Sequence, residues 1–382
     1  MIAHHPRNGF DGANTLYHLM HRDILDYLSA TREHGGSDLH MTVGAPPAAR
    51  IDGKLVPLED YDVEPQRCRE LIMAILTDTQ RAKLEKDWEL DFALNVENVG
   101  RFRGNAHIVR GNVEAAFRYI PSEAPELESL GHSETVANFC KATHGLLLLT
   151  GVTGTGKSTT LAAMTRRILE TRSNIVVTVE DPIEYAFEHK YGLIKQRQIG
   201  HDTHSFPAAI RAALRQDVDV LIISEMRDQD SIAAALTAAE TGHLVISTLH
   251  TRSCVGALDR IVDVFSSNQQ AQIVTQMAGA LIGVVSQRLF PRADAPGRVM
   301  ATEVMVVNDG IRAAIHDHRF EQVYSLMQVG ASSGMHTFDD SLLHLCCNGY
   351  MTLDEAMLNA RNPPTLQSEF QEYLRKQAAR SK

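Results

Sequence analysis

The stretch GVTGTGKST, residues 151–159, contains the residue types needed to hold a phosphate group. It fits the pattern G-x-x-x-x-G-K-[ST], with Gly151 and Gly156 as the fixed glycines, followed by Lys157 and Ser158. Glycines allow backbone N–H groups to turn toward a phosphate, and a following helix adds its positive N-terminal dipole. We expect Lys157 to neutralise β- and γ-phosphate oxygens of ATP and the Ser158 hydroxyl to hold Mg²⁺. The other loop residues expected around the nucleotide are Thr153, Gly154, Thr155 and Thr159.

Hydrolysis of a nucleoside triphosphate also requires carboxylates, which activate water and organise the metal shell. Glu225 directly follows the apolar run DVLIIS, with Ser224 at a position where an aspartate would often lie. The stretch EDPIE, after another apolar run, offers three more carboxylates: Glu180, Asp181 and Glu184. For Asp181, capping of a following helix explains the residue as well as direct chemistry does, so both roles stay open.

Two histidines, His243 and His250, flank the apolar run LVISTL. If this run is a strand, seven residues of extended chain separate them by roughly 23 Å, and the odd offset directs their side chains to opposite faces. They therefore cannot share one metal ion. We expect His250 to lie near the nucleotide and His243 to have a structural or subunit-contact role.

Four short apolar runs alternate with helical stretches and are the elements that must position these residues. They are residues 145–150, 174–179, 219–224 and 243–248. This alternation is typical of a parallel α/β sheet that is buried on both faces. Ligands of such sheets bind at the carboxyl ends of the strands, and each run is followed there by polar residues. Beyond about residue 254 the period is mainly helical, as in QQAQIVTQMAGALIGVVSQRLF.

The N-terminal part has a different pattern. A helical start, LYHLMHRDILDYLSATREHG, precedes alternating strand-like segments that are joined at D-G and G-N turns, which indicates a small α+β domain. Pro121 and Pro125 make the following segment a stiff, polar connector. The expected domains are residues 1–120, a linker at 121–133 and residues 134–382.

The composition restricts the possible partners and compartment. A formal charge of −10 gives no support to a nucleic-acid partner, and five scattered cysteines without paired spacing fit a reducing cytosol. The N-terminus lacks the features of a signal peptide, and the longest apolar runs are too short to span a bilayer. We expect a cytoplasmic protein that meets a membrane only peripherally.

The ordered motifs GVTGTGKSTT, VTVEDPIEY, AIRAALRQDVDVLIISEMRD and TGHLVISTLHT resemble the Walker A, Asp, Walker B and His boxes of the secretion-ATPase superfamily. Within it they resemble the type IV pilus retraction ATPase (PilT) family. GGSDLHMTVGAPPAARIDGKL is similar to that family's N-terminal domain, and ALDRIVDVF, VVSQRL and GMHTFDDSL to its C-terminal region. The resemblance extends over about residues 15–355.

This resemblance implies a homohexamer in which each subunit joins a PAS-like N-terminal domain to a RecA-like P-loop ATPase domain with a helical C-terminal part. ATP would bind between the ATPase domain of one subunit and the N-terminal domain of its neighbour. Glu184 would activate water, with Glu180 or Glu225 as alternatives, Glu225 would take the Walker B role, and His250 would contact the γ-phosphate region. Arginines would approach the nucleotide or an inter-subunit contact: Arg101, Arg103, Arg110 and Arg260. The partners would be an inner-membrane pilus platform protein, at the membrane's cytoplasmic face, and a paralogous retraction ATPase.

Two positions depart from the family pattern. Ser224 stands where the family usually has glycine, and we expect its side chain to affect the rate of ATP turnover. GIRAAIHDHRF, residues 310–320, matches the family's retraction segment loosely, with Arg312 and Ile315 as counterparts. The alternatives are a pilus-assembly or type II secretion ATPase, a type IV secretion ATPase, an accessory retraction ATPase, a RecA-like nucleic-acid motor, and a nucleotide-dependent ring without turnover. The four-cysteine zinc insert of assembly ATPases is not seen in the sequence.

Overall fold

The computed structural model describes residues 22–51, 53–121 and 123–380. The chain divides into two compact units, with the division between Ser122 and Glu123. Residues 16–21 of the expected N-terminal helix lie outside the described residues, whereas the rest of it forms a helix from Ile24. Each unit is described by itself below.

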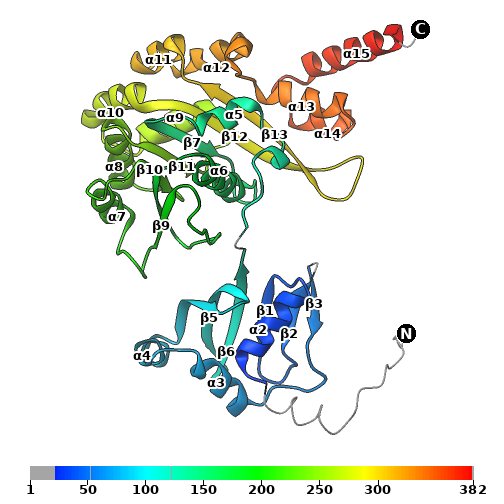
Figure 1. The fold of residues 1–382 in the computed structure, drawn as a ribbon. Helices are drawn as coiled ribbons and strands as arrows, with labels where there is room; N and C mark the ends of the chain where they lie inside the picture. Colours follow the sequence, from blue (N-terminus) through cyan, green and yellow to red (C-terminus); the bar gives the residue numbers. More distant parts are fainter. Residues whose placement is uncertain (1–21, 52, 122, 381–382) are drawn as a thin grey trace. The chain divides into compact units, whose positions relative to one another are not determined.

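The first unit is an α+β fold built on a six-stranded antiparallel sheet with the strand order β3-β2-β1-β6-β5-β4 (Figure 1). Its elements are α2 (Ile24–Glu33), β1 (Asp38–Met41), β2 (Ala48–Ile51), β3 (Lys54–Pro57), α3 (Pro65–Ala74), α4 (Asp78–Asp87), β4 (Glu89–Val96), β5 (Gly100–Val109) and β6 (Asn112–Ile120). Phe102 and Phe117 are fully buried beneath the helices, while Arg101 and Arg103 lie on the opposite face of β5, as the alternation of a strand requires. The predicted D-G and G-N hairpins correspond to β2–β3 and β5–β6.

The second unit contains a seven-stranded sheet with the order β13-β12-β7-β11-β10-β8-β9. All neighbouring strands are parallel except β13, which pairs antiparallel with β12. The strands are β7 (Gly145–Thr150), β8 (Ile175–Glu180), β9 (Leu193–Gln198), β10 (Val220–Ile223), β11 (Leu244–Leu249), β12 (Leu281–Pro291) and β13 (Arg298–Val306). The four predicted strands are thus confirmed as β7, β8, β10 and β11.

Helices cover both faces of this sheet, because alternate residues of each strand face opposite layers. Leu146 and Leu148 pack with α7 (Phe206–Ala213), α8 (Gln229–Glu240), α9 (Cys254–Asp263) and α10 (Ser267–Ala280). Leu147 and Leu149 pack with α5 (Glu134–Phe139) and α6 (Lys157–Thr171). This burial on both faces explains why the central strands are continuous apolar runs.

The prediction of helical structure from residue 254 onward is wrong for residues 281–306, which form β12 and β13. The run LIGVVSQRLF follows the helix α10 without a break in apolar character, so its period alone could not separate a buried strand from a buried helix. Strand β9 was also not predicted, because its sequence LIKQRQ is polar and lies at the edge of the sheet.

The C-terminal part after β13 is helical, as expected. Its helices are α11 (Asp309–His316), α12 (Phe320–Gln328), α13 (Phe338–Cys347), α14 (Leu353–Asn359) and α15 (Pro363–Arg380), with a short 3₁₀ turn at Ala331–Ser333 between α12 and α13. Another short 3₁₀ turn, Glu128–Leu130, precedes α5. No helix among the described residues is both long and apolar enough to cross a bilayer.

Part of the expected linker packs on the second unit. Ala124 and Leu127 are both 2% exposed, and the Arg166 guanidinium of α6 donates a hydrogen bond to the Ala124 carbonyl. The connector from Ala124 onward therefore belongs structurally to the second unit.

Candidate nucleotide-binding site

The phosphate-binding motif lies between β7 and α6, in a cavity of ≈ 1080 Å³ at the carboxyl edge of the sheet. Gly156 is the N-cap of α6 with φ 86°, a left-handed conformation that favours glycine. The cavity is bordered by loop residues Thr153, Gly154, Thr155, Gly156, Lys157, Ser158 and Thr159, and by Glu180, Asp181, Glu184, Ser224, Glu225 and His250. The loops after the four predicted strands therefore meet at one site, and Gly151 begins the first of these loops.

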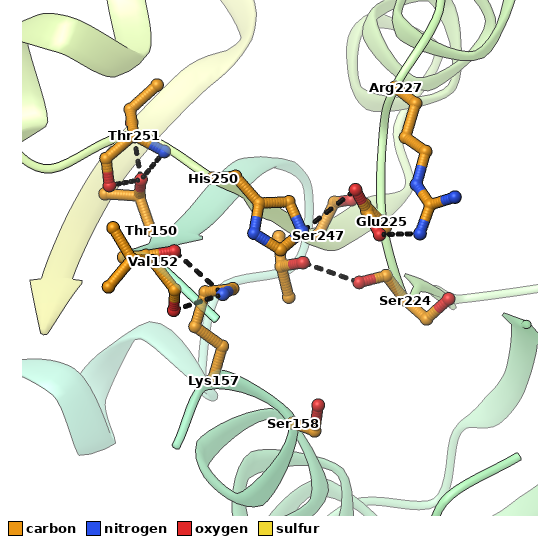
Figure 2. A network of polar contacts seen from close by, with 12 residues as sticks. Thr150, Val152, Lys157, Ser158, Ser224, Glu225, Arg227, Ser247, His250 and Thr251 are labelled. Atoms are coloured by element: carbon orange, nitrogen blue, oxygen red, sulfur yellow. Dashed lines mark hydrogen bonds and ion pairs between the residues drawn. The ribbon is translucent and has the colours of Figure 1, made fainter. Parts of the chain in front are cut away.

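Lys157 is 8% exposed and its ammonium group lies within the loop (Figure 2). Nζ donates hydrogen bonds to the carbonyls of Gly151 at 2.8 Å and Val152 at 3.0 Å. Burial lowers the pKa of Lys157, although the charges of Glu225 and Glu184 act in the opposite direction. A partly desolvated cation of this kind is suited to an anion such as a phosphate.

Ser158 and Glu184 form the second feature of the site. Ser158 Oγ donates a hydrogen bond of 2.9 Å to Oε1 of Glu184, which follows β8. A hydroxyl and a carboxylate are oxygen ligands of the kind that Mg²⁺ takes together with substrate phosphates. These two residues therefore fit a magnesium ion, although no cluster of three or more His, Cys, Asp or Glu side chains occurs within the described ranges.

Glu225 has two partners, Arg227 and His250, which Figure 2 shows on either side of its carboxylate. Arg227 Nη2 donates to Oε2 at 2.7 Å, and His250 Nε2 lies 2.9 Å from Oε1. Burial alone would raise the pKa of Glu225, but Arg227 and His250 outweigh it and hold this pKa below its usual value. Glu225 is thus an ionised carboxylate whose position depends on His250.

Glu180 is held differently. Its Oε1 accepts hydrogen bonds from Thr178 Oγ1 at 2.6 Å and from Gln196 Nε2 at 3.0 Å. Burial raises the pKa of Glu180 in spite of these bonds. Because one of its oxygens is already shared by two donors, Glu180 is less free than Glu184 to act on a water molecule.

The two histidines of the TGHLVISTLHT stretch lie at opposite ends of β11. His243 Nδ1 is 3.0 Å from the Ala238 carbonyl at the end of α8, and His243 does not border the cavity. His250 borders the cavity and contacts Glu225. Their unequal placement agrees with the spacing argument.

The four expected arginines do not border this cavity. Arg101 and Arg103 share a face of β5 in the first unit, and Arg103 lies 3.9 Å from Asp91. Arg110 occupies the turn between β5 and β6 with φ 50°. Arg260 is an exposed residue of α9 in the second unit.

Several polar residues of the site were not predicted. Arg227 and Gln196 bind the two carboxylates described above, and Gln287 of β12 borders the cavity beside the loop. Arg118 of the first unit does not border the cavity and was not predicted either; it lies directly opposite Arg103 and donates to Asp38 at 2.8 Å. The sequence signal for Arg118 was its strand alternation in VEAAFRYI, and for Arg227 its position two residues after Glu225.

The two departures from the family pattern have different surroundings. Ser224 borders the cavity, and its carbonyl accepts a hydrogen bond of 2.6 Å from Thr248 Oγ1. Arg312 of α11 donates hydrogen bonds to the carbonyls of Ala278 and Gly279 at the end of α10, and Ile315 is fully buried. In this structure Arg312 and Ile315 therefore serve the packing of their own unit.

Comparison with known proteins identifies the family. A family model described as "Type II/IV secretion system protein" matches residues 20–358. The chain belongs to this family. Among its curated members, the type IV pilus retraction ATPase PilT of Pseudomonas aeruginosa is 40% identical over 341 residues, which cover 89% of this chain and 99% of that protein.

Two further members of the secretion-ATPase family are similar over most of their length. A twitching motility protein of Neisseria gonorrhoeae is 38% identical, and the match covers 84% of this chain and 86% of that protein. The type IV pilus ATPase PilU of Pseudomonas aeruginosa is 34% identical, with 86% of each chain covered. The resemblance to the PilT family is thereby confirmed.

A solved structure agrees with this assignment. The crystal structure of the pilus retraction motor PilT with bound ADP has a TM-score of 0.84 and 43% identity, and the match covers 91% of this chain and 100% of that chain. The second unit therefore has the RecA-like α/β fold of the secretion ATPases.

Proposed function

We propose that this chain is a hexameric ATPase that hydrolyses ATP to power type IV pilus retraction, and hence twitching motility. The observation that supports this most strongly is the juxtaposition of Lys157, Ser158, Glu184, Glu225 and His250 at one edge of the sheet. The match to PilT covers 89% of this chain and 99% of that protein. The relative crystallised with ADP is consistent with a nucleotide at this site.

In the reaction, the oxygen of a water molecule attacks the γ-phosphorus of ATP, and the bond to the β–γ bridging oxygen breaks. ADP leaves with the electrons of that bond, and the proton of the water passes to a carboxylate. We assign this role to Glu184, whose carboxylate lies 2.9 Å from the Ser158 hydroxyl, whereas Glu180 is already shared by two donors.

The remaining residues bind and orient. Lys157 and the backbone N–H groups of residues 153–159 would hold the phosphates, and Ser158 would be a ligand of Mg²⁺. When bound, Mg²⁺ supplies positive charge that stabilises the phosphate oxygens. Glu225 would orient this magnesium shell, and His250, fixed through Glu225, would meet the γ-phosphate region.

The first unit would complete the site of a neighbouring subunit. This proposal treats it as the PAS-like domain of the family, and its supporting observation is a cluster of exposed guanidinium groups on one sheet face. Arg103 and Arg118 are directly opposite each other, and each has one carboxylate near it, Asp91 at 3.9 Å and Asp38 at 2.8 Å. Both side chains remain exposed and can contact a further anion. A guanidinium introduced across an interface stabilises the charge of phosphoryl transfer. Arg101, Arg110 and Arg260 stay candidates for the same or another inter-subunit contact.

Movement would occur between the two units. Because Ala124 and Leu127 are buried in the second unit, the hinge that we propose is confined to the residues before Ala124. Opening and closing of the six interfaces in order would act on an inner-membrane platform protein at the cytoplasmic face of the membrane.

A second candidate is an accessory retraction ATPase that works beside a paralogous main motor. The observation that favours it is that Arg312 and Ile315 are used for packing within their own unit. These two residues of the expected retraction segment are then not available to contact a partner. The similarity to PilU is compatible with this role. A RecA-like nucleic-acid motor is the alternative of another class, and DNA-stimulated ATP hydrolysis with salt-sensitive DNA binding would support it over the pilus function.

A deletion strain tests the function directly. Loss of the retraction motor should leave cells that are hyperpiliated and unable to twitch, and the intact gene should restore movement whereas a Lys157→Ala copy should not. Bald cells would instead identify an assembly ATPase, and unchanged piliation and twitching would exclude a main retraction role.

A further inference from the structure

Gln287 of β12 lies directly behind the phosphate-binding loop and contacts it through its side-chain amide. Strand β12 runs parallel to β7 with Ser286 opposite Thr150, which places Gln287 level with the start of the loop. The side chain is fully buried, and Nε2 donates a hydrogen bond of 2.8 Å to the Thr155 carbonyl. The loop is therefore fastened to a neighbouring strand by one side chain.

The two fixed glycines of the loop also pack against this residue. A Cβ atom added to Gly151 would lie 2.5 Å from the Gln287 carbonyl oxygen, and one added to Gly156 would lie 3.3 Å from Gln287 Nε2. The first distance is too short for any side chain, and the second requires Gln287 to shift. The close approach of the loop to β12 thus depends on glycine at both positions. This requirement for glycine is additional to the one that phosphate binding would impose.

The hydrogen bond to Thr155 fixes a peptide plane. In a trans peptide the carbonyl oxygen and the following N–H point in opposite directions. Because Gln287 holds the Thr155 carbonyl toward β12, the N–H of Gly156 is directed away from β12. Among the described residues, no hydrogen bond uses this N–H. It is therefore available to an anion in the cavity that Thr155, Gly156 and Lys157 border.

The orientation of the amide follows from the same contact, because the reversed amide would place Oε1 against the Thr155 carbonyl oxygen. In the observed orientation Oε1 is buried, and within the part of the chain that the structure describes it has no hydrogen-bond partner. An unpaired buried acceptor destabilises a fold, so an apolar side chain would serve packing better at this position.

We propose that Gln287 is a positioning residue for the β-phosphate of the bound nucleotide, because it holds the Thr155–Gly156 peptide with its N–H toward the ligand. This inference rests on the proposed nucleotide-dependent function. It assigns Gln287 no contact with the reacting atoms, so its removal should weaken binding of nucleotides that carry a β-phosphate. AMP, which has only an α-phosphate, should be much less affected.

The test uses two variants of the full chain, Gln287→Met and Gln287→Glu. Methionine keeps the length of the side chain but has no hydrogen-bond donor. Glutamate keeps the shape of the side chain but places a carboxylate oxygen against the Thr155 carbonyl oxygen. The affinities for ADP and AMP are measured by displacement of a fluorescent ADP analogue. We expect each variant to bind ADP about tenfold more weakly and AMP within about twofold of the unchanged chain. In ATP hydrolysis, KM should rise more than kcat falls.

Gln270→Met is the matched control. Gln270 Nε2 donates to the carbonyls of Val262 and Phe265 at the end of α9, and Gln270 does not border the cavity. This variant loses the same type of amide–carbonyl contact and should bind ADP as the unchanged chain does.

The outcomes separate this inference from the proposed function. If the unchanged chain does not bind ADP more tightly than Lys157→Ala does, the proposed function fails. If the unchanged chain binds ADP and a folded Gln287 variant binds it equally well, the positioning role is wrong. An equal loss of ADP and AMP affinity would also overturn it, because that result indicates general damage to the site. If one variant does not fold, as judged by thermal melting, the other decides.

Discussion

Ser158 Oγ donates a hydrogen bond of 2.9 Å to Oε1 of Glu184, and this contact joins the first turn of α6 to the loop after β8. The contact places the carboxylate proposed to accept a proton next to the hydroxyl proposed to bind Mg²⁺. It links the two chemical functions of the site through a pair of residues that are distant in the sequence, and it leads to the first prediction.

Glu184→Gln should preserve ATP binding and reduce turnover by about a hundredfold or more. The amide can keep a hydrogen bond with Ser158 but cannot accept the proton of the attacking water. Binding of a fluorescent ATP analogue and release of phosphate are measured on the same preparation. Glu188→Gln is the control, since Glu188 is an exposed residue of the same loop that does not border the cavity. Unchanged turnover in Glu184→Gln would transfer the role to Glu180 or Glu225.

His250→Ala should lower the ATPase rate by about tenfold, because it removes a hydrogen bond to the ionised carboxylate of Glu225. His243→Ala removes only a contact with the Ala238 carbonyl at the other end of β11, and its rate should stay within about twofold of the unchanged chain. Equal losses in the two variants, with the assembly of the unchanged chain preserved by size measurement, would contradict the division of roles along β11.

Arg103→Ala and Arg118→Ala should each reduce hydrolysis, by about tenfold or more if the guanidinium groups act on the phosphates of a neighbouring subunit. Mixing Arg103→Ala subunits with Lys157→Ala subunits should restore part of the activity. Some interfaces then combine an intact loop from one variant with intact arginines from the other.

Arg69→Ala is the control for these mixtures, because Arg69 pairs with Glu85 on the surface of the first unit and should have no effect. If mixtures never exceed the activity of the separate variants, the proposal that Arg103 acts between subunits is wrong.

The half-buried His132 predicts a loss of stability in acid. His132 Nε2 lies 2.9 Å from Thr160 Oγ1, and burial lowers its pKa from 6.5 to about 4, with His336 acting in the same direction. Below pH 6.5 the unfolded chain binds this proton and the folded chain does not, so stability falls as the pH decreases from 6.5 to 4. The full effect is about 3 kcal/mol.

The melting temperature of His132→Gln should therefore decrease less between pH 7.5 and pH 5 than that of the unchanged chain. His316→Gln, at an exposed position of α11, should follow the unchanged chain. A parallel decrease in all three proteins would show that His132 does not contribute.

The site was more predictable than the sheet around it. Lys157, Glu184, Glu225 and His250 could be placed together because each follows a continuous apolar strand, and parallel strands present their carboxyl ends at one edge. Strand β12 could not be recognised, since LIGVVSQRLF continues the apolar character of the preceding helix, and only its pairing with β7 and β13 makes it extended.

The partners of the site residues were also beyond the sequence. The hydrogen bond between Gln287 and Thr155 spans 132 positions, and that between Gln196 and Glu180 depends on the unpredicted strand β9. Such contacts depend on which strands are neighbours, and local patterns carry no information on strand order.

The rate of ATP hydrolysis by the purified chain, compared with Lys157→Ala at equal concentration, tests the central claim most directly. The account predicts Mg²⁺-dependent phosphate release that falls by about a hundredfold or more in Lys157→Ala, because this variant removes the buried cation that faces the phosphates. A rate for the unchanged chain no higher than that of Lys157→Ala would contradict the account. That result would instead indicate a ring that binds nucleotide without turnover, with Ser224 at the cavity wall as the first residue to substitute by glycine.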